Sequence, residues 1–289
     1  MWVIYSLLTA FSLATSDALA KKALASRDVY FVAWGRLLFA LPVFLATFFF
    51  IEIPDLDRVF WMAAICALPL EIIAMILYTK ALKVSPISLT TPFLALTPLF
   101  LIVTAYIILG EKVSMYGLSG IVLMAVGSYT LNFHRIGYDV LEPFKTALRE
   151  KGIGMMIVVA FIFSITASFG KLAIEHSSPV FFGSFYFILL TLLFTPIAYF
   201  RSRGGMTIKK QDLLPLASTG VTYAMMIIFH MIAMSMTNVA YMISVKRTSL
   251  LFSVLYGYLL FREEKIMERA IGASIMFTGF VLLVFSKQG

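Results

Sequence analysis

The sequence consists almost entirely of apolar runs that are separated by short polar segments. A helix needs about 20 apolar residues to cross a hydrocarbon core roughly 30 Å thick, and each run is long enough for one crossing. Because backbone groups find no water in lipid, spanning segments must be helices or strands of a closed barrel. The runs lack the alternation of apolar and polar residues that barrel strands show. They therefore predict an all-α integral membrane protein.

Charged and turn-forming residues divide the chain into ten predicted transmembrane helices. These cover residues 2–24, 29–51, 58–82, 86–108, 113–133, 152–175, 179–201, 211–234, 238–261 and 266–286. Only 13% of the residues are charged, which leaves little sequence for a water-soluble domain. The formal charge of +8 is spread over loops and helix ends, and this distribution argues against nucleic-acid binding.

The second half of the chain repeats the first. A shift of 152 positions aligns the fourth and fifth spans with the ninth and tenth without a gap. The aligned identities include Phe100 with Phe252, Tyr106 with Tyr258, Glu111 with Glu263, Gly120 with Gly272 and Gly127 with Gly279. A shift of 150 positions also aligns Lys21 with Lys171.

Each repeat contains five spans, which is an odd number, so the second copy must enter the membrane in the opposite direction to the first. We therefore expect two inverted five-helix repeats, residues 1–133 and 152–289, joined by a polar linker at 134–151. Inverted repeats of this kind are typical of secondary transporters, whose substrate sites lie near the bilayer midplane between the copies.

Several motifs resemble the drug/metabolite transporter superfamily, EamA type. Residues 88–114, SLTTPFLALTPLFLIVTAYIILGEKVS, are similar to the fourth-span signature of that family, and residues 249–265 echo them. The stretch 34–38, WGRLL, resembles the segment of that family that carries an arginine in the second span, and Arg36 is the corresponding residue. The resemblance covers nearly the whole chain and implies ten spans in two five-span units. The stretch 244–248, SVKRT, is similar to a ninth-span pair of the sugar-phosphate and nucleotide-sugar branch, where its implied role is to hold a phosphate.

Five charged residues fall well inside predicted spans: Arg36, Lys246, Arg247, Asp17 and Glu71. Such residues are expensive in lipid and are functional candidates by default. The pair Lys246 and Arg247 alone costs about 5–7 kcal/mol on the insertion scale unless water or a partner solvates it. A water-filled cavity that accepts anions would remove most of this cost.

The internal repeat strengthens this interpretation of the Lys246–Arg247 pair. The aligned residues of the first repeat are Leu94 and Ala95, so the scaffold does not require charge at these positions. An ammonium together with a guanidinium suits a phosphate or a carboxylate. We predict that the pair binds an anionic substrate.

Other side chains are candidates for the same cavity. Predicted substrate-binding residues besides the pair are Arg36, Ser244, Thr248, Tyr241, Tyr78, Tyr223 and Trp34. Predicted proton-coupling residues are Glu71, Asp17 and His230. The alternative for the charged residues is an ion pair of Lys246 or Arg247 with Glu71 or Asp17 that locks helices together, and for the aromatic residues it is packing.

Prolines and glycines suggest local backbone features. Pro86, Pro92 and Pro98 predict a bent fourth span, whereas the ninth span has no proline and cannot be bent by the same device. The glycine pairs that recur in the fifth and tenth spans predict close helix packing. Glu111 and Glu263 are interpreted as helix-start or interfacial caps.

Basic residues predict the orientation in the membrane. Sixteen lysines and arginines follow odd-numbered spans and four follow even-numbered spans. Since basic residues concentrate in cytoplasmic loops, the count predicts that both termini lie outside. The family resemblance implies cytoplasmic termini instead.

Motifs for nucleotide binding, hydrolysis or metal binding are missing, so we expect no enzyme activity, cofactor or metal. We expect a secondary transporter in the plasma or inner membrane, a monomer or homodimer, that moves a small anionic metabolite by alternating access. Alternatives are an exporter of amino acids or amphipathic drug-like compounds, with the Lys246–Arg247 pair structural, and a flippase for a phosphate-linked lipid. An intramembrane enzyme is disfavoured.

Overall fold

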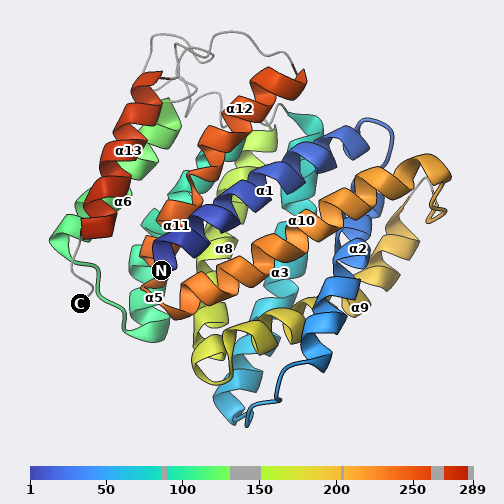
Figure 1. Cartoon of the computed structure of the whole chain (residues 1–289), viewed down its shortest axis with the longest axis horizontal. Helices are drawn as coiled ribbons and strands as arrows, with labels where there is room; N and C mark the ends of the chain where they lie inside the picture. Colours follow the sequence, from blue (N-terminus) through green and yellow to red (C-terminus); the bar gives the residue numbers. More distant parts are fainter. Residues whose placement is uncertain (86–89, 131–150, 203–204, 262–269, 286–289) are drawn as a thin grey trace.

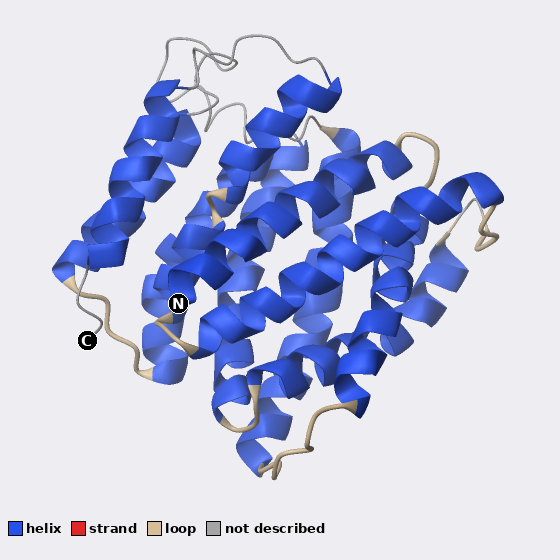
Figure 2. Cartoon of the chain, viewed as in Figure 1, coloured by secondary structure: helices blue, strands red, loops and turns tan. Residues whose placement is uncertain are grey.

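The computed structural model describes residues 1–85, 90–130, 151–202, 205–261 and 270–285. Within these ranges every regular element is a helix, as Figure 2 shows. In chain order they are α1 (Trp2–Leu24), α2 (Val29–Phe49), α3 (Arg58–Val84), the 3₁₀ helix η1 (Thr91–Ala95), α5 (Leu96–Leu109), α6 (Met115–Thr130), α8 (Lys151–Glu175), α9 (Pro179–Arg201), α10 (Lys210–Ser235), α11 (Val239–Lys246), α12 (Ser249–Phe261) and α13 (Ala270–Phe285).

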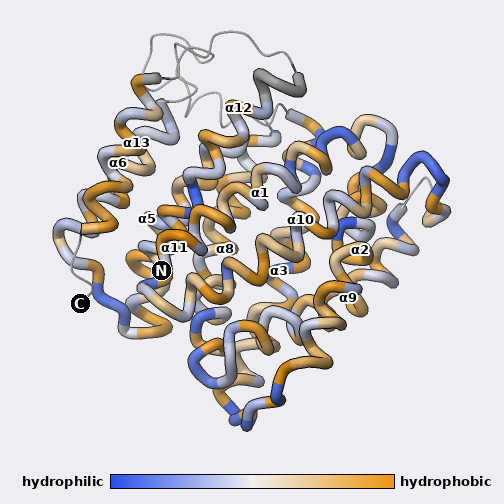
Figure 3. The backbone as a smooth tube through the Cα atoms, in the orientation of Figure 1, coloured by the Kyte–Doolittle hydropathy of each residue, from blue (hydrophilic) through white to orange (hydrophobic). Residues whose placement is uncertain are grey.

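Seven helical segments in the described part of the chain are long and apolar enough to cross a membrane. Two further apolar helices, Met115–Thr130 and Ile271–Phe285, are shorter. Hydropathy along the backbone follows the same division, with apolar residues along the helices and hydrophilic ones at helix ends and loops (Figure 3). The predicted all-α membrane architecture is confirmed, while the predicted linker 134–151 lies outside the described residues except for Lys151.

Helix starts follow local sequence signals. Asp28 caps α2, because its carboxylate accepts hydrogen bonds from the backbone N–H groups of Tyr30 and Phe31 at 2.8 and 3.1 Å. Asp57 caps α3 by accepting from Phe60 N at 2.9 Å. That hydrogen bond, with a smaller contribution from His176 on a neighbouring loop, lowers the pKa of Asp57.

The bundle is built mainly from contacts between residues 1–130 and residues 151–285. The most extensive contacts join α1 to α10, α3 to α8, α6 to α13, α2 to α10 and α2 to α9, as Figure 1 shows. Each of these pairs contains one helix from either side of residue 150. The interface between the two parts of the chain therefore runs through the middle of the molecule.

Two aligned lysines, Lys21 on α1 and Lys171 on α8, have the same structural role. Each ammonium donates to carbonyl groups at the C-terminal end of another helix, where such groups lack partners within the helix. The contacts are Lys21 Nζ to the carbonyls of Leu82 (2.5 Å) and Ser85 (3.0 Å), and Lys171 Nζ to those of Met234 (2.7 Å) and Thr237 (3.3 Å). The second pair of acceptors lies 152 positions after the first.

The predicted close packing of the glycine-bearing helices is confirmed. Helices α6 and α13 lie side by side at one edge of the bundle (Figure 1). A Cβ atom on Gly127 would lie 2.5 Å from Met276 N, and one on Gly279 would lie 2.8 Å from the Gly120 carbonyl oxygen. Only glycine allows the backbones to approach this closely.

Both the fourth and the ninth segments are interrupted, at aligned positions. In the fourth, the 3₁₀ helix η1 gives way to α5 at Leu96, beside Pro92 and Pro98, whereas Pro86 lies outside the described residues. The ninth ends α11 at Lys246 and resumes as α12 at Ser249, without a proline. Here backbone hydrogen bonds of the tighter 3₁₀ type, from the N–H of residue i to the carbonyl of residue i−3, replace the α-helical pattern.

Glu111 caps a helix start, as predicted. Its Oε2 accepts a hydrogen bond from Val239 N at 2.9 Å, at the first residue of α11. The glutamate therefore connects the loop after α5 to the beginning of the ninth segment. Burial of its carboxyl group raises the pKa of Glu111, and the hydrogen bond from Val239 N offsets part of this rise. The aligned residue, Glu263, lies outside the described part of the chain.

Candidate functional site

A cavity of about 120 Å³ lies in the middle of the bundle. Its walls come from α1, α2, α3, α5, α8, α9, α10 and α11 and from η1, and thus from both parts of the chain. This volume accommodates several water molecules or part of a small solute. The cavity is the best candidate for a solute site because polar and charged side chains converge on it.

Lys246 lines this cavity and is half-buried. Among the residues that the structure describes, no carboxylate lies within ion-pair distance of its ammonium and no hydrogen-bond acceptor contacts it. The lysine is the last residue of α11, where the negative end of the helix dipole favours a cation. The interruption of the ninth segment therefore places an unpaired charge at the cavity.

Arg247 follows Lys246 and also lines the cavity. One of its terminal nitrogens, Nη2, donates to Thr97 Oγ1 at 2.9 Å. Its Nε atom is buried and has no hydrogen-bond partner in the described part of the chain. A buried guanidinium with an unused donor can bind an oxygen atom of an anionic ligand.

Arg36 differs from Arg247 in having a carboxylate partner, although its Nε and Nη2 atoms are also buried without a hydrogen-bond partner among the described residues. Its Nη1 lies 3.1 Å from Asp17 Oδ1, and its guanidinium carbon lies 4.1 Å from the centre of the Tyr223 ring. The second oxygen of Asp17 accepts a 2.5 Å hydrogen bond from the Tyr78 hydroxyl. The ion-pair alternative considered for Lys246 and Arg247 is therefore realised by Arg36, which takes Asp17 as its partner.

The predicted proton-coupling residues are divided by the structure. Glu71 and His230 line the cavity, and the buried His230 Nδ1 has no hydrogen-bond partner among the described residues. Asp17 does not line it and is bonded to Arg36 and Tyr78. Glu71 and His230 thus remain the candidates that a solute can reach.

Four predicted substrate-binding residues lie outside the cavity lining because their polar groups are used elsewhere. The contacts are Trp34 Nε1 to Thr195 Oγ1 (3.2 Å), Ser244 Oγ to the Ala240 carbonyl (2.8 Å), Thr248 Oγ1 to the Val245 carbonyl (2.8 Å) and Ser114 N to the Tyr241 hydroxyl (2.9 Å). Ser244 and Thr248 are close to Lys246 in sequence, but their hydroxyls bond to the backbone of their own segment. Tyr78 and Tyr223, in contrast, do line the cavity.

A stripe of cavity residues on α10 was identified from the sequence only in part, through Tyr223 and His230. The stripe contains Tyr223, Met226, Ile227, His230, Met231 and Met234, which recur at helical spacing. Extending this spacing from Tyr223 and His230 would have found the methionines. The apolar wall is completed by aromatic rings from other helices, namely Phe163, Phe182 and Phe187.

Tyr186 on α9 is a second cavity residue that was not identified from the sequence. Its hydroxyl is buried at the cavity and has no hydrogen-bond partner among the described residues. The shift of 150 positions that aligns Lys21 with Lys171 also aligns Arg36 with Tyr186. This alignment with Arg36 is the feature of the sequence that could have identified Tyr186 as a cavity residue.

Comparisons with known proteins agree with the fold. The family model for EamA-like transporters matches residues 1–133 and 150–285. A relative from Arabidopsis thaliana, the "Probable magnesium transporter NIPA2", is 33% identical over 96 residues, which cover 30% of this chain and 29% of that protein. A solved crystal structure matches with a TM-score of 0.72 at 14% identity, over 97% of this chain and 95% of that chain, and shares the fold.

Proposed function

Starting from the fact that this chain belongs to the EamA-like transporter family, and is therefore a membrane transporter, we propose that it moves a small anionic metabolite by secondary transport. The solute carries a phosphate or a carboxylate group, and it binds in the central cavity. Lys246 and Arg247 are the residues that recognise this group.

The unpaired ammonium of Lys246 carries this proposal. A charged side chain inside a membrane protein costs free energy unless water, a partner or a ligand solvates it. Of the two intramembrane carboxylates considered, Asp17 is occupied by Arg36, and Glu71 forms no ion pair with Lys246. An anionic solute that enters the cavity would supply the missing partner and would complete the hydrogen bonding of Arg247.

The rest of the cavity favours a solute with an apolar or ring-shaped body. Six phenylalanine and tyrosine rings and four methionine side chains contribute to the rest of the wall, and methionine adapts its shape to different ligands. This same wall favours the second candidate, an exporter of amino acids or amphipathic drug-like metabolites. The two candidates differ in whether binding depends on Lys246.

We further propose that the chain forms ten transmembrane segments in two inverted repeats and works by alternating access. The separate matches of the family model to residues 1–133 and 150–285 support this arrangement. The equivalent contacts of Lys21 and Lys171 and the aligned interruptions of the fourth and ninth segments support it as well. A cavity lined by both repeats can open to either side when one repeat tilts against the other.

The cavity residues do not suit magnesium, the ion in the relative's name. Magnesium prefers carboxylate oxygens and bound water. Lys246 and Arg247 at this cavity would repel a divalent cation, and Asp17 is already paired. Glu71 and His230 are better suited to proton coupling, in which a change of protonation accompanies solute movement.

The proposal is tested with purified protein and with proteoliposomes. Ligand binding to the native state raises the apparent melting temperature, so phosphorylated sugars, carboxylates and aromatic amino acids are compared as ligands. We expect shifts from anions with the wild type and no anion-dependent shift with Lys246→Met. Lys112→Met, which changes an exposed lysine outside the cavity, is the matched control.

Two results would contradict the proposal. Anion-dependent shifts that persist in Lys246→Met would favour the exporter of amphipathic solutes. Movement of a phosphate-linked lipid between leaflets, without uptake of any soluble anion, would favour the flippase.

A further inference from the structure

A second hollow, which shares no lining residue with the central cavity, lies between the end of α1 and the beginning of α10. This groove has a volume of about 440 Å³. Its apolar part is formed by Leu19, Phe31, Leu214 and Pro215, and its polar rim includes Lys22 and Gln211. Lys22 lies in the last turn of α1, and Gln211 lies in the first turn of α10. The rim therefore lies at a membrane surface, with the leucines one turn deeper.

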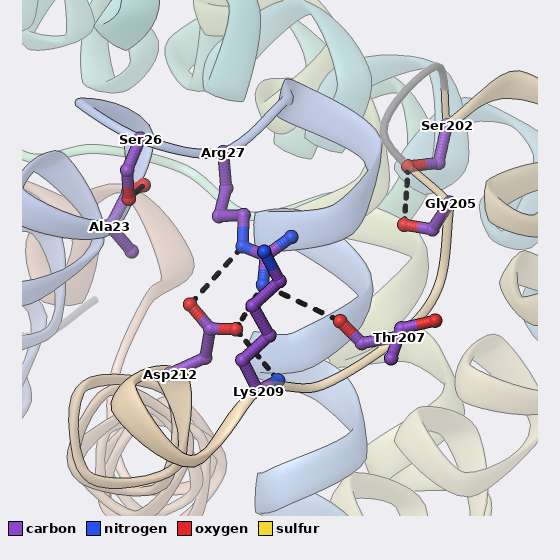
Figure 4. A network of polar contacts seen from close by, with 8 residues as sticks. All are labelled: Ala23, Ser26, Arg27, Ser202, Gly205, Thr207, Lys209 and Asp212. Atoms are coloured by element: carbon purple, nitrogen blue, oxygen red, sulfur yellow. Dashed lines mark hydrogen bonds and ion pairs between the residues drawn. The ribbon is translucent and has the colours of Figure 1, made fainter.

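Arg27, which also borders the groove, is already neutralised. Figure 4 shows its guanidinium directed at the Asp212 carboxylate and the Thr207 carbonyl. Asp212 accepts from Arg27 Nε at 3.1 Å and from Lys209 N at 2.9 Å, so both of its oxygens are used. Asp212 is therefore not available to pair with Lys22.

The ammonium of Lys22 is exposed and has no hydrogen-bond or ion-pair partner within the described ranges. Gln211 beside it is also exposed and adds an amide donor to the rim. The neighbouring Lys210 adds a further exposed positive charge. The groove thus combines a cationic rim with an apolar floor, and Leu214 is 79% exposed on that floor.

We propose that this groove binds one anionic phospholipid, with the phosphate on Lys22 and Gln211 and the first part of an acyl chain on Leu19 and Leu214. Charge complementarity favours an anionic over a zwitterionic headgroup, and basic pockets between transmembrane helices at the membrane surface are suited to such lipids. The basic residues at this end of the bundle agree with this choice: Lys22, Arg27, Lys80, Lys83, Arg201, Lys209 and Lys210.

The lipid would join the two parts of the chain. Lys22 belongs to α1 and Gln211 to α10, and these helices pack against each other. Arg27, in the loop after α1, also forms an ion pair with Asp212 on α10. A lipid bound across this contact stabilises the arrangement in which the two helix ends lie together. The site is independent of the solute cavity, so it goes beyond the proposed transport function.

The experiment measures thermal unfolding of the full chain in neutral detergent micelles that contain increasing amounts of phosphatidylglycerol or phosphatidylcholine with the same acyl chains. We expect the wild type to be stabilised more by phosphatidylglycerol. In Lys22→Gln the phosphatidylglycerol concentration for half of this effect should rise about fivefold, the factor that one lysine near an anionic surface contributes. Gln211→Glu, which adds a negative charge to the rim, should weaken the effect as well.

Two control variants distinguish the groove from the other basic residues of the protein. Arg201→Gln removes an exposed charge at the same end but outside the groove and should leave the lipid effect unchanged. Lys246→Met should also retain it, so failure of the transport proposal would not affect this result. Three outcomes would overturn the lipid site: equal stabilisation by both lipids, an unchanged effect in Lys22→Gln, or the same Lys22-dependent stabilisation by inorganic phosphate alone.

Discussion

Arg36 and Lys246 are both basic residues of predicted transmembrane spans, and both line the same cavity, but their surroundings differ. Arg36 is ion-paired with Asp17 and covers the Tyr223 ring. Lys246 has no partner of either kind among the described residues. The difference separates a cation that stabilises the bundle from one that can bind a solute, although the sequence presents both simply as intramembrane charges.

The largest expected effect is the loss of stability when the paired cation, Arg36, loses its carboxylate partner. Asp17→Ala leaves Arg36 as an uncompensated charge and removes the acceptor of the Tyr78 hydroxyl. Breaking a buried ion pair on one side costs about 3–5 kcal/mol, so thermal unfolding in detergent should show a large loss of stability. Glu71→Ala is the matched control, because Glu71 has no ion pair to lose among the described residues. Equal stability of Asp17→Ala and the wild type would remove the distinction between the two cations.

Substitution of the unpaired cation, Lys246, should reduce transport and leave stability unchanged. Lys246→Met removes the proposed partner of the solute anion and should reduce transport in proteoliposomes by at least about 30-fold, the factor that corresponds to about 2 kcal/mol for a buried charge contact. Its melting temperature should not fall, because no side-chain hydrogen bond or ion pair within the described part of the protein is lost. A clear loss of stability with normal transport would instead show that Lys246 is structural.

Thr97→Val tests how Arg247 is held in position, and its expected effect is smaller than those of Asp17→Ala and Lys246→Met. Valine keeps the shape of threonine but cannot accept the hydrogen bond from Arg247 Nη2. Leaving a buried donor unsatisfied costs about 1–3 kcal/mol, and the less well placed guanidinium should raise KM more than it lowers the maximal rate. Thr97→Ser should restore both values, and a KM unchanged in Thr97→Val would show that this contact does not position the site.

The smallest effect is expected at Tyr186. Its hydroxyl has no partner in the described part of the protein, so Tyr186→Phe should change stability by less than about 0.5 kcal/mol. If the hydroxyl contacts the solute, transport should fall by about two- to tenfold, as for the loss of one hydrogen bond. Phe187→Tyr serves as a volume control in the neighbouring position. A substantial loss of stability would show that the Tyr186 hydroxyl has a structural role.

Features with a local physical cause were predictable from the sequence. The α9 helix spans residues 179–201 as expected, because Ser178 and Pro179 provide a strong helix start. Glu111 was correctly interpreted as a cap, and the aligned glycines of α6 and α13 as packing residues. The residue types were informative in each case, but the helix start that Glu111 caps lies 128 positions away and was not predictable from them.

The choice of cavity residues was less predictable. Ser244 and Thr248 were selected because they lie close to Lys246 in sequence, but their hydroxyls bond to backbone carbonyls. Proximity in sequence does not specify which side of a helix faces the cavity, and the interruption between α11 and α12 changes the helical spacing at this point. The stripe on α10 was missed because its methionines look like ordinary membrane-facing residues.

The order of residues was sufficient to establish that this chain is a helical membrane protein, where most of its helices begin and end within a few residues, and that it carries cations in its spans. Hydropathy, capping and charge act over a few neighbouring residues, so these properties are visible without the fold. Which cation has a carboxylate partner became clear from the packed bundle alone. Asp17 on α1 reaches Arg36 on α2, and the distance between atoms on different helices depends on packing that no local pattern specifies.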